Sequence, residues 1–158
     1  MRLLRLAVPL LLVPSILAAQ RPVGAAPQVE LRAEGILSPI GGAMAGVGVN
    51  VRAGWYARVG LALSAGAIGV GGVSESVQRL DGTARFLFDP FAEARRAFYA
   101  GAGLGVRRAG SGATQGFLLG VVGVEGATVG RVVPSVELTL GGGARLGVIL
   151  RGKRQQGR

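Results

Sequence analysis

The 158-residue chain contains no cysteine and no histidine. It therefore has no disulfide, no Cys/His zinc or thiolate–haem site, no cysteine nucleophile and no histidine-based catalytic triad. Aromatic residues make up only 5% of the chain, and Lys153 is the single lysine beside seventeen arginines. Glycine is abundant, at 29 residues, and 49% of the chain is hydrophobic. This composition indicates one domain of Gly-rich strands that pack closely.

The formal net charge is +10, and without the first 19 residues it is +8, from 16 basic and 8 acidic residues. A basic chain can bind nucleic acid or anionic lipid. Here the arginines are spread along the chain, and the only basic run is the tail that begins at Arg151. No aromatic platform is interleaved with the charges, so the pattern does not favour nucleic-acid binding.

The N-terminal segment is typical of a secretory signal peptide. Two arginines precede an apolar run of about 12 residues, and small residues follow at Ala18 and Ala19. The run is shorter than the ~20 residues that a spanning helix needs. We therefore predict a signal peptide over 1–19 and a short linker over 20–26, with Ala26 as a second cleavage position. An uncleaved anchor or a buried helix is the alternative, and a lipoprotein anchor is excluded because no cysteine follows.

The rest of the chain alternates between apolar and polar or small residues in short blocks, which is typical of β-strands. Eight strands are predicted, and they lie over 27–36, 43–53, 55–69, 75–89, 96–107, 113–125, 131–141 and 143–152. An even number of antiparallel strands with tight connections predicts an all-β, eight-stranded, up-and-down transmembrane barrel. The barrel domain spans 27–152, and a basic tail spans 153–158. Pro134 removes one ladder donor, which predicts a bulge in the seventh strand.

The two rows of side chains differ in polarity. One row is aliphatic, and Phe117, Leu119 and Val121 are assigned to it, although their block alternates least clearly. The other row carries charges between glycines, and a lone arginine at mid-bilayer costs about 2–4 kcal/mol. The charged row must then face the lumen, which in eight strands is just wide enough for side chains to fill. The predicted ion-pair network, without an open pore, comprises Glu30, Arg32, Glu34, Arg52, Arg58, Arg79, Asp81, Arg85, Glu137 and Arg145.

Two other architectures remain open. A soluble lipocalin-like barrel would place the aliphatic row inside and the charged row in water. A pair of Gly-rich transmembrane helices is a weaker alternative, because the run 59–73 has only 15 residues. The many Gly and Ala residues of the charged row favour a crowded lumen over a water-facing surface.

Seven of the eight aromatic residues lie near two connections, which an up-and-down barrel places at one end. They are predicted to form a membrane-interface girdle and are Trp55, Tyr56, Phe86, Phe88, Phe91, Phe98 and Tyr99. An aromatic cluster that plugs one mouth of a soluble barrel is the alternative. The connections at the opposite end are all short, so they offer little surface for recognition.

These features together resemble the small outer-membrane β-barrel family of OmpA/OmpX-like proteins. The resemblance covers residues 27–152 and includes turn-flanked segments such as Asp89-Pro90-Phe91 and the run 98–103. It implies a place in the outer membrane and insertion by the outer-membrane assembly machinery. Members of the family usually end their last strand in an aromatic residue, whereas this strand ends at Leu150 before a basic tail.

Chemical motifs are sparse. The run 101–105 has the spacing of a dinucleotide glycine loop but lacks the following helix. Asp81 and Glu137 could form a carboxylate pair for acid/base work, although neutralising lumen arginines is the favoured interpretation. The segment 89–96 could form one helical turn at the rim.

The sequence thus predicts a non-enzymatic, monomeric outer-membrane barrel with a structural or interaction role. No cofactor, metal or nucleic acid is expected, and the partners are the lipid bilayer and the assembly machinery. The alternative function is a soluble periplasmic barrel that carries an apolar ligand.

Overall fold

The computed structural model describes residues 26–37, 41–70, 72–90, 96–110, 112 and 114–153. The predicted signal peptide and all of the linker except Ala26 lie outside the described residues. Phe91, the central part of the 89–96 segment and the tail beyond Lys153 also lie outside them.

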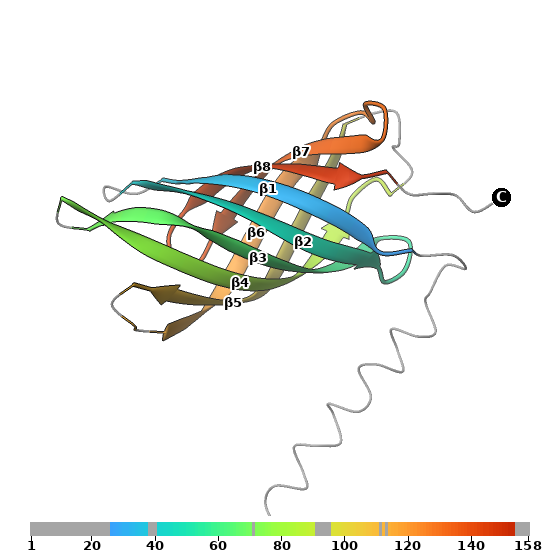
Figure 1. Cartoon of the computed structure of the whole chain (residues 1–158). Coiled ribbons are helices and arrows are strands. Elements are labelled where there is room, and N and C mark those ends of the chain that lie inside the picture. The colour runs from blue at the N-terminus through green and yellow to red at the C-terminus, as the bar shows by residue number, and fades with distance from the viewer. Residues whose placement is uncertain are drawn as a thin grey trace, which may run out of the picture.

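The chain folds into eight antiparallel strands. They are β1 (Gln28–Ile36), β2 (Gly42–Arg52), β3 (Ala57–Val70), β4 (Val73–Leu87), β5 (Ala97–Ala109), β6 (Thr114–Glu125), β7 (Val132–Leu140) and β8 (Arg145–Gly152). Each strand pairs with its sequence neighbours, and β1 pairs with β8, so the sheet closes into a barrel (Figure 1). The predicted eight-stranded up-and-down barrel is confirmed. No helix among the described residues is long and apolar enough to cross a membrane.

The barrel has two distinct ends. At one end, here called the terminal end, β1 begins, β8 ends and the connections β2–β3, β4–β5 and β6–β7 lie. Figure 1 shows this end on the right. The other end, here called the distal end, carries the remaining four connections. Its β7–β8 turn contains three consecutive glycines with positive φ, and a Cβ at Gly141 would overlap the carbonyl oxygen of Leu118. Because this turn is tight, β8 begins at Arg145, two residues later than predicted.

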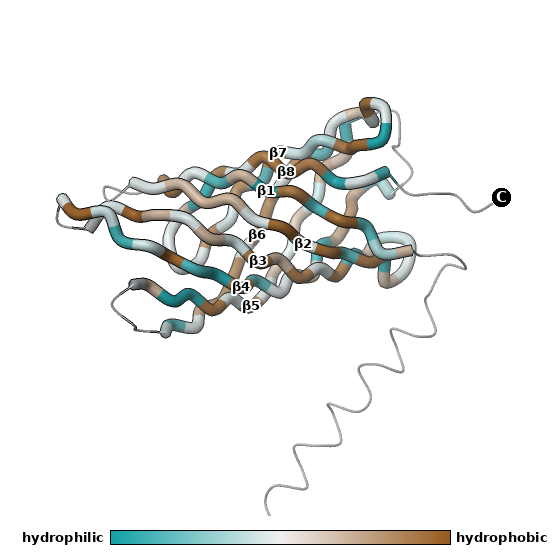
Figure 2. The backbone as a smooth tube through the Cα atoms, in the orientation of Figure 1, coloured by the Kyte–Doolittle hydropathy of each residue, from teal (hydrophilic) through white to brown (hydrophobic). Residues whose placement is uncertain are grey.

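The alternation along the strands separates an apolar exterior from a charged interior, and Figure 2 shows hydrophilic and hydrophobic residues following one another along β4. The exposed aliphatic side chains include Val29, Leu31, Val47, Val49, Leu61, Leu63, Leu104, Leu118, Val122, Val136, Leu140, Leu146, Val148 and Leu150. The buried charges belong to the opposite row. The soluble alternative, with the aliphatic row inside, is therefore wrong, because the structure places that row outside.

The side chains of β6 that face the lumen differ from those predicted. Leu119 and Val121 are buried and Phe117 is half-buried, whereas Leu118 is 77% exposed. Both rows of this strand are apolar, so a rule that sends the aliphatic row outward cannot decide between them. The register decides, because Phe117 is paired with Gly105 and fills the space that a Cβ there would need.

The predicted bulge at Pro134 is absent. The register with β8 runs without interruption from Val132 to Thr139. In an antiparallel pair, the N–H and C=O groups of one residue point to the same neighbour. The Pro134 carbonyl accepts a hydrogen bond from Gly126 N at 2.8 Å, just beyond the end of β6. The missing N–H thus points to Gly126, beyond the last β6–β7 pair, Glu125 and Ser135, so the ladder within β6 is unaffected.

The apolar exterior has a defined height on β4. Outward residues are apolar from Phe88 to Leu80 and turn polar at Gln78, followed by Ser76 and Ser74. Eight residue steps span about 27 Å along a strand, or about 20 Å along the barrel axis at a tilt of ~40°. Transmembrane barrels carry an apolar band about 25 Å tall, so this surface fits the hydrocarbon of a bilayer.

We predict that an outward charge in this band destabilises the barrel. Ala84→Arg places a guanidinium at its middle, four residues from both Phe88 and Leu80, and should lower the free energy of unfolding by about 2–4 kcal/mol, whereas Ser74→Arg at the distal rim should cost at most about 1 kcal/mol. Urea titration in phospholipid vesicles, followed by the fluorescence of Trp55, the single tryptophan, measures both. Equal costs for the two variants would contradict the assigned band.

Candidate functional site: the charged lumen

Eight buried charged side chains form one connected network in the middle of the lumen. Each is at most 7% exposed, and four arginines balance four carboxylates. The members are Glu30, Arg32, Glu34, Arg79, Asp81, Arg85, Glu137 and Arg145. A buried ion is stable only when it is paired and its hydrogen-bonding capacity is used. The network meets the first condition because it is neutral as a whole.

Glu137 on β7 is one centre of this network. Arg32 Nη2 donates to its Oε1 at 2.5 Å, and Arg85 Nε donates to its Oε2 at 3.0 Å. The hydroxyl of Tyr99 donates to Oε2 at 2.9 Å. These three donors come from β1, β4 and β5, so a single carboxylate holds three other strands across the lumen.

Asp81 on β4 is the second centre. Arg79 Nε donates to its Oδ1 at 2.8 Å, and Arg145 Nη2 donates to its Oδ2 at 2.9 Å. Arg145 also donates through Nη1 to Glu34 Oε2 at 2.7 Å. Strands β4 and β8 face each other across the barrel, so Arg145 bridges the full width of the lumen as well as the β1–β8 seam.

A separate cluster lies toward the terminal end. Glu125, at the end of β6, accepts hydrogen bonds from Arg58 on β3 and from Arg151 on β8. Asn50 on β2 donates to Glu30 Oε1 at 2.9 Å. With these contacts, every strand supplies at least one polar side chain to the lumen.

The lumen narrows toward the distal end around the β7–β8 turn. Arg79 Nη2 donates to the carbonyl of Gly141 at 3.0 Å, and its guanidinium lies 4.1 Å from the centre of the Phe117 ring. Arg107 donates to the carbonyl of Gly142 at 3.3 Å and to Gln115 at 2.6 Å. On the β2–β4 side, a buried apolar cluster of Met44, Ile68 and Val77 packs inside the barrel.

Nine of the ten residues predicted for the lumen network take part in these contacts. Arg52 lies apart, at the end of β2, where it donates to the carbonyl of Pro90 at 3.3 Å. The sequence interpretation missed Glu125 and Arg151. Arg151 lies six residues after Arg145 on the same strand, so alternation turns both side chains inward. The inward row of β6 begins and ends with a polar residue, Gln115 and Glu125. These two features of the sequence could have identified Arg151 and Glu125.

Five of the predicted girdle residues are exposed at the terminal end, and they are Trp55, Tyr56, Phe86, Phe88 and Phe98. The Tyr56 and Phe86 rings stack with centroids 5.7 Å apart, and Phe88 meets Phe86 edge-on at 5.6 Å. Tyr99 was assigned wrongly. It follows Phe98, which is 64% exposed, so strand alternation turns Tyr99 inward, where it is 3% exposed and bonded to Glu137.

The structure leaves the two chemical motifs without a reactive arrangement. Asp81 and Glu137 bind different arginines, Asp81 with Arg79 and Arg145 and Glu137 with Arg32 and Arg85. The 101–105 glycine run lies within β5 and is paired on both sides, so it is a strand and not a phosphate-binding loop.

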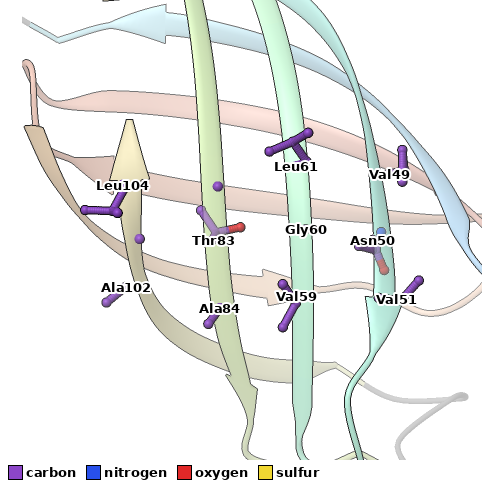
Figure 3. Close-up of a pocket in the computed structure, with 12 residues that line it drawn as sticks. Val49, Asn50, Val51, Val59, Gly60, Leu61, Thr83, Ala84, Ala102 and Leu104 are labelled. Carbon is purple, nitrogen blue, oxygen red and sulfur yellow. The ribbon is translucent and has the colours of Figure 1, made fainter. Parts of the chain in front are cut away.

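The outer surface carries an open apolar groove of about 540 Å³ over β2 to β5 (Figure 3). Its floor includes Ala84 and Ala102, which are cross-strand partners, and its walls include Val59, Leu61 and Leu104. A Cβ at Gly82 would have its nearest neighbour at 3.8 Å, so backbone crowding does not require the glycine there. This hollow faces outward with the aliphatic row and is suited to hydrocarbon.

Comparison with solved structures identifies the fold. Neisserial surface protein A (NspA) superposes with a TM-score of 0.61 at 17% identity, over 80% of this chain and 95% of that one. The N-terminal β-barrel domain of Pseudomonas aeruginosa OprF superposes with a TM-score of 0.52 at 20% identity, over 78% and 96%. The fold is that of the small outer-membrane β-barrels. No family model and no curated protein sequence matches the chain.

We predict that Glu137 is the most costly lumen carboxylate to neutralise. Glu137→Gln leaves Arg32 and Arg85 buried with one fewer charge partner, and removing one partner of a buried pair costs about 3–5 kcal/mol. Glu75→Gln, at the half-buried distal end of β4, should cost less than about 1 kcal/mol. Urea unfolding in vesicles measures both, and a loss for Glu137→Gln no larger than the control would refute the assignment.

Proposed function

We propose that the protein is a non-enzymatic barrel of the outer membrane with a structural or interaction role and a lumen closed by its own side chains. One observation carries the proposal: an exterior that is apolar around the barrel encloses an interior of paired charges. A bilayer accepts the first surface, and the second is stable only away from lipid.

Several features support the absence of a transport or catalytic role. The Arg145–Asp81 and Arg85–Glu137 ion pairs cross the lumen, from β8 to β4 and from β4 to β7, and leave these charges neutralised. An eight-stranded barrel has room for side chains but not for a water-filled channel. The carboxylates that could act as acid or base, Asp81 and Glu137, each form ion pairs with two arginines.

The carrier alternative requires an apolar cavity inside the barrel. The buried apolar residues form small clusters, such as Leu87, Tyr99 and Val121, which pack against one another. The apolar hollows over β2–β5 and β5–β8 lie on the outside instead. The structure thus favours a bilayer over a soluble ligand as the partner of the aliphatic row. We further propose that the barrel is a monomer inserted by the outer-membrane assembly machinery.

Fractionation and conductance test the proposal together. We expect the protein in the detergent-extracted outer membrane and a faster gel migration before heating than after it. Reconstituted in a planar bilayer, the folded barrel should give no stable conductance steps, with a known wide porin as the positive control. A mature chain that stays soluble without detergent would refute the membrane role, and reproducible channel steps would refute the closed lumen.

A further inference from the structure

A second outward groove, of about 390 Å³, lies at the terminal end over β5 to β8. One rung of cross-strand partners runs along it: Phe98 on β5, Val124 on β6, Val136 on β7 and Val148 on β8. All four face outward, and the ring of Phe98 is 64% exposed. The groove therefore continues the apolar exterior up to the level of the aromatic girdle.

The floor of this groove presents no free backbone donor. Pro134 has no N–H, and its carbonyl is bonded to Gly126 N at 2.8 Å. Gly126 lacks a side chain, and a Cβ there would lie 3.3 Å from Pro134 Cγ. The two residues thus make a shallow apolar depression that water would solvate poorly and that a hydrocarbon chain would fill.

The mouth of the groove is cationic. Arg96 lines it and is exposed, two residues before Phe98 on the same face. Arg131 and Lys153 are also exposed at this end, joined by a backbone hydrogen bond of 2.6 Å. The nearby carboxylate of Glu125 is bound by Arg58 and Arg151, so its charge is neutralised. The end of the groove at the bilayer interface thus favours a negative charge.

The leaflet at this end follows from the topology. Both ends of an even-stranded barrel lie on one side, and here they lie at the terminal end. A chain inserted from the periplasm leaves the terminal end on that side, because moving Arg131 and Lys153 across the hydrocarbon is costly. The terminal end then meets the periplasmic leaflet, which consists of phospholipids.

We propose that this groove binds one anionic phospholipid of the periplasmic leaflet, with an acyl chain along Val124 and Val136 and the phosphate on Arg96. This inference rests on the proposed place in the outer membrane. Juxtamembrane cations attract anionic lipid with about 1 kcal/mol each, which corresponds to about a fivefold change in affinity. The exposed ring of Phe98 lies at the same end of the barrel as Trp55 and Tyr56, the kinds of residue that settle at a bilayer interface.

Native mass spectrometry of the detergent-purified barrel tests whether the positive charge of Arg96 contributes to lipid binding. The probes are dioleoyl phosphatidylglycerol and dioleoyl phosphatidylethanolamine at equal concentrations. We expect one retained phosphatidylglycerol, and Arg96→Gln should weaken that binding about fivefold without weakening phosphatidylethanolamine equally. Arg108→Gln is the matched control, because Arg108 is an exposed outward arginine at the distal end. Equal losses in the two variants would overturn the site.

A second pair of variants tests the groove. Val124→Phe fills it, whereas Val122→Phe adds the same bulk to the outward face of β6 two residues away, outside the groove lining. Only Val124→Phe should reduce retention of both lipids. If both lipids bind equally well and no variant changes their binding, the retained molecule is an adventitious lipid only, and the inference fails. The proposed function fails separately, if the mature wild-type chain stays soluble without detergent.

Discussion

The pairing of charges inside the barrel is the constraint on which the rest of the structure depends. When the aliphatic row faces outward, the alternating row must face the lumen. That second row carries arginines and carboxylates. Buried ions are tolerated only when they neutralise each other. The central network does so with four arginines and four carboxylates, and four of its ion pairs join strands that are not neighbours in the sheet. These pairs connect walls of the barrel that backbone hydrogen bonds do not connect.

Glycines and the bulky residues of β6 complete the packing around these charges. Glycines alternate along β5, and a Cβ at Gly101 or Gly103 would overlap the backbone of β4, whereas a Cβ at Gly105 would meet Phe117 and Asp81. Phe117 and Leu119 then occupy the space above Gly105 and Gly103, and the ring of Phe117 covers the guanidinium of Arg79. Charge, ring and glycine together fill the distal part of the lumen.

Much of this arrangement could be predicted from the sequence, because period-2 alternation specifies both the strands and their faces. The eight strands, the closed barrel and the lumen residues from Glu30 to Arg145 follow from that one pattern. The prediction was wrong for β6, where the two alternating rows of side chains do not differ in polarity. Both rows of β6 are apolar, so the facing of Phe117 is set by its cross-strand glycine, a long-range contact that local sequence does not encode.

Two further errors each concern a single residue. Tyr99 was grouped with its aromatic neighbours by composition, although alternation with the outward Phe98 turns it toward Glu137. The bulge predicted at Pro134 depended on which neighbour its missing donor faces, and this is known only from the register. The signal peptide remains a prediction, since the segment 1–25 lies outside the described residues.

A double-mutant cycle between Glu34 and Arg145 tests the central claim most directly. These side chains join β1 to β8 at 2.7 Å across the closure of the barrel. The free energy of unfolding in vesicles is compared for Glu34→Gln, Arg145→Met and the double variant. The account predicts a coupling of about 0.5–3 kcal/mol, because each single change leaves a buried charge with one fewer partner. Additive effects, with no coupling, would contradict it.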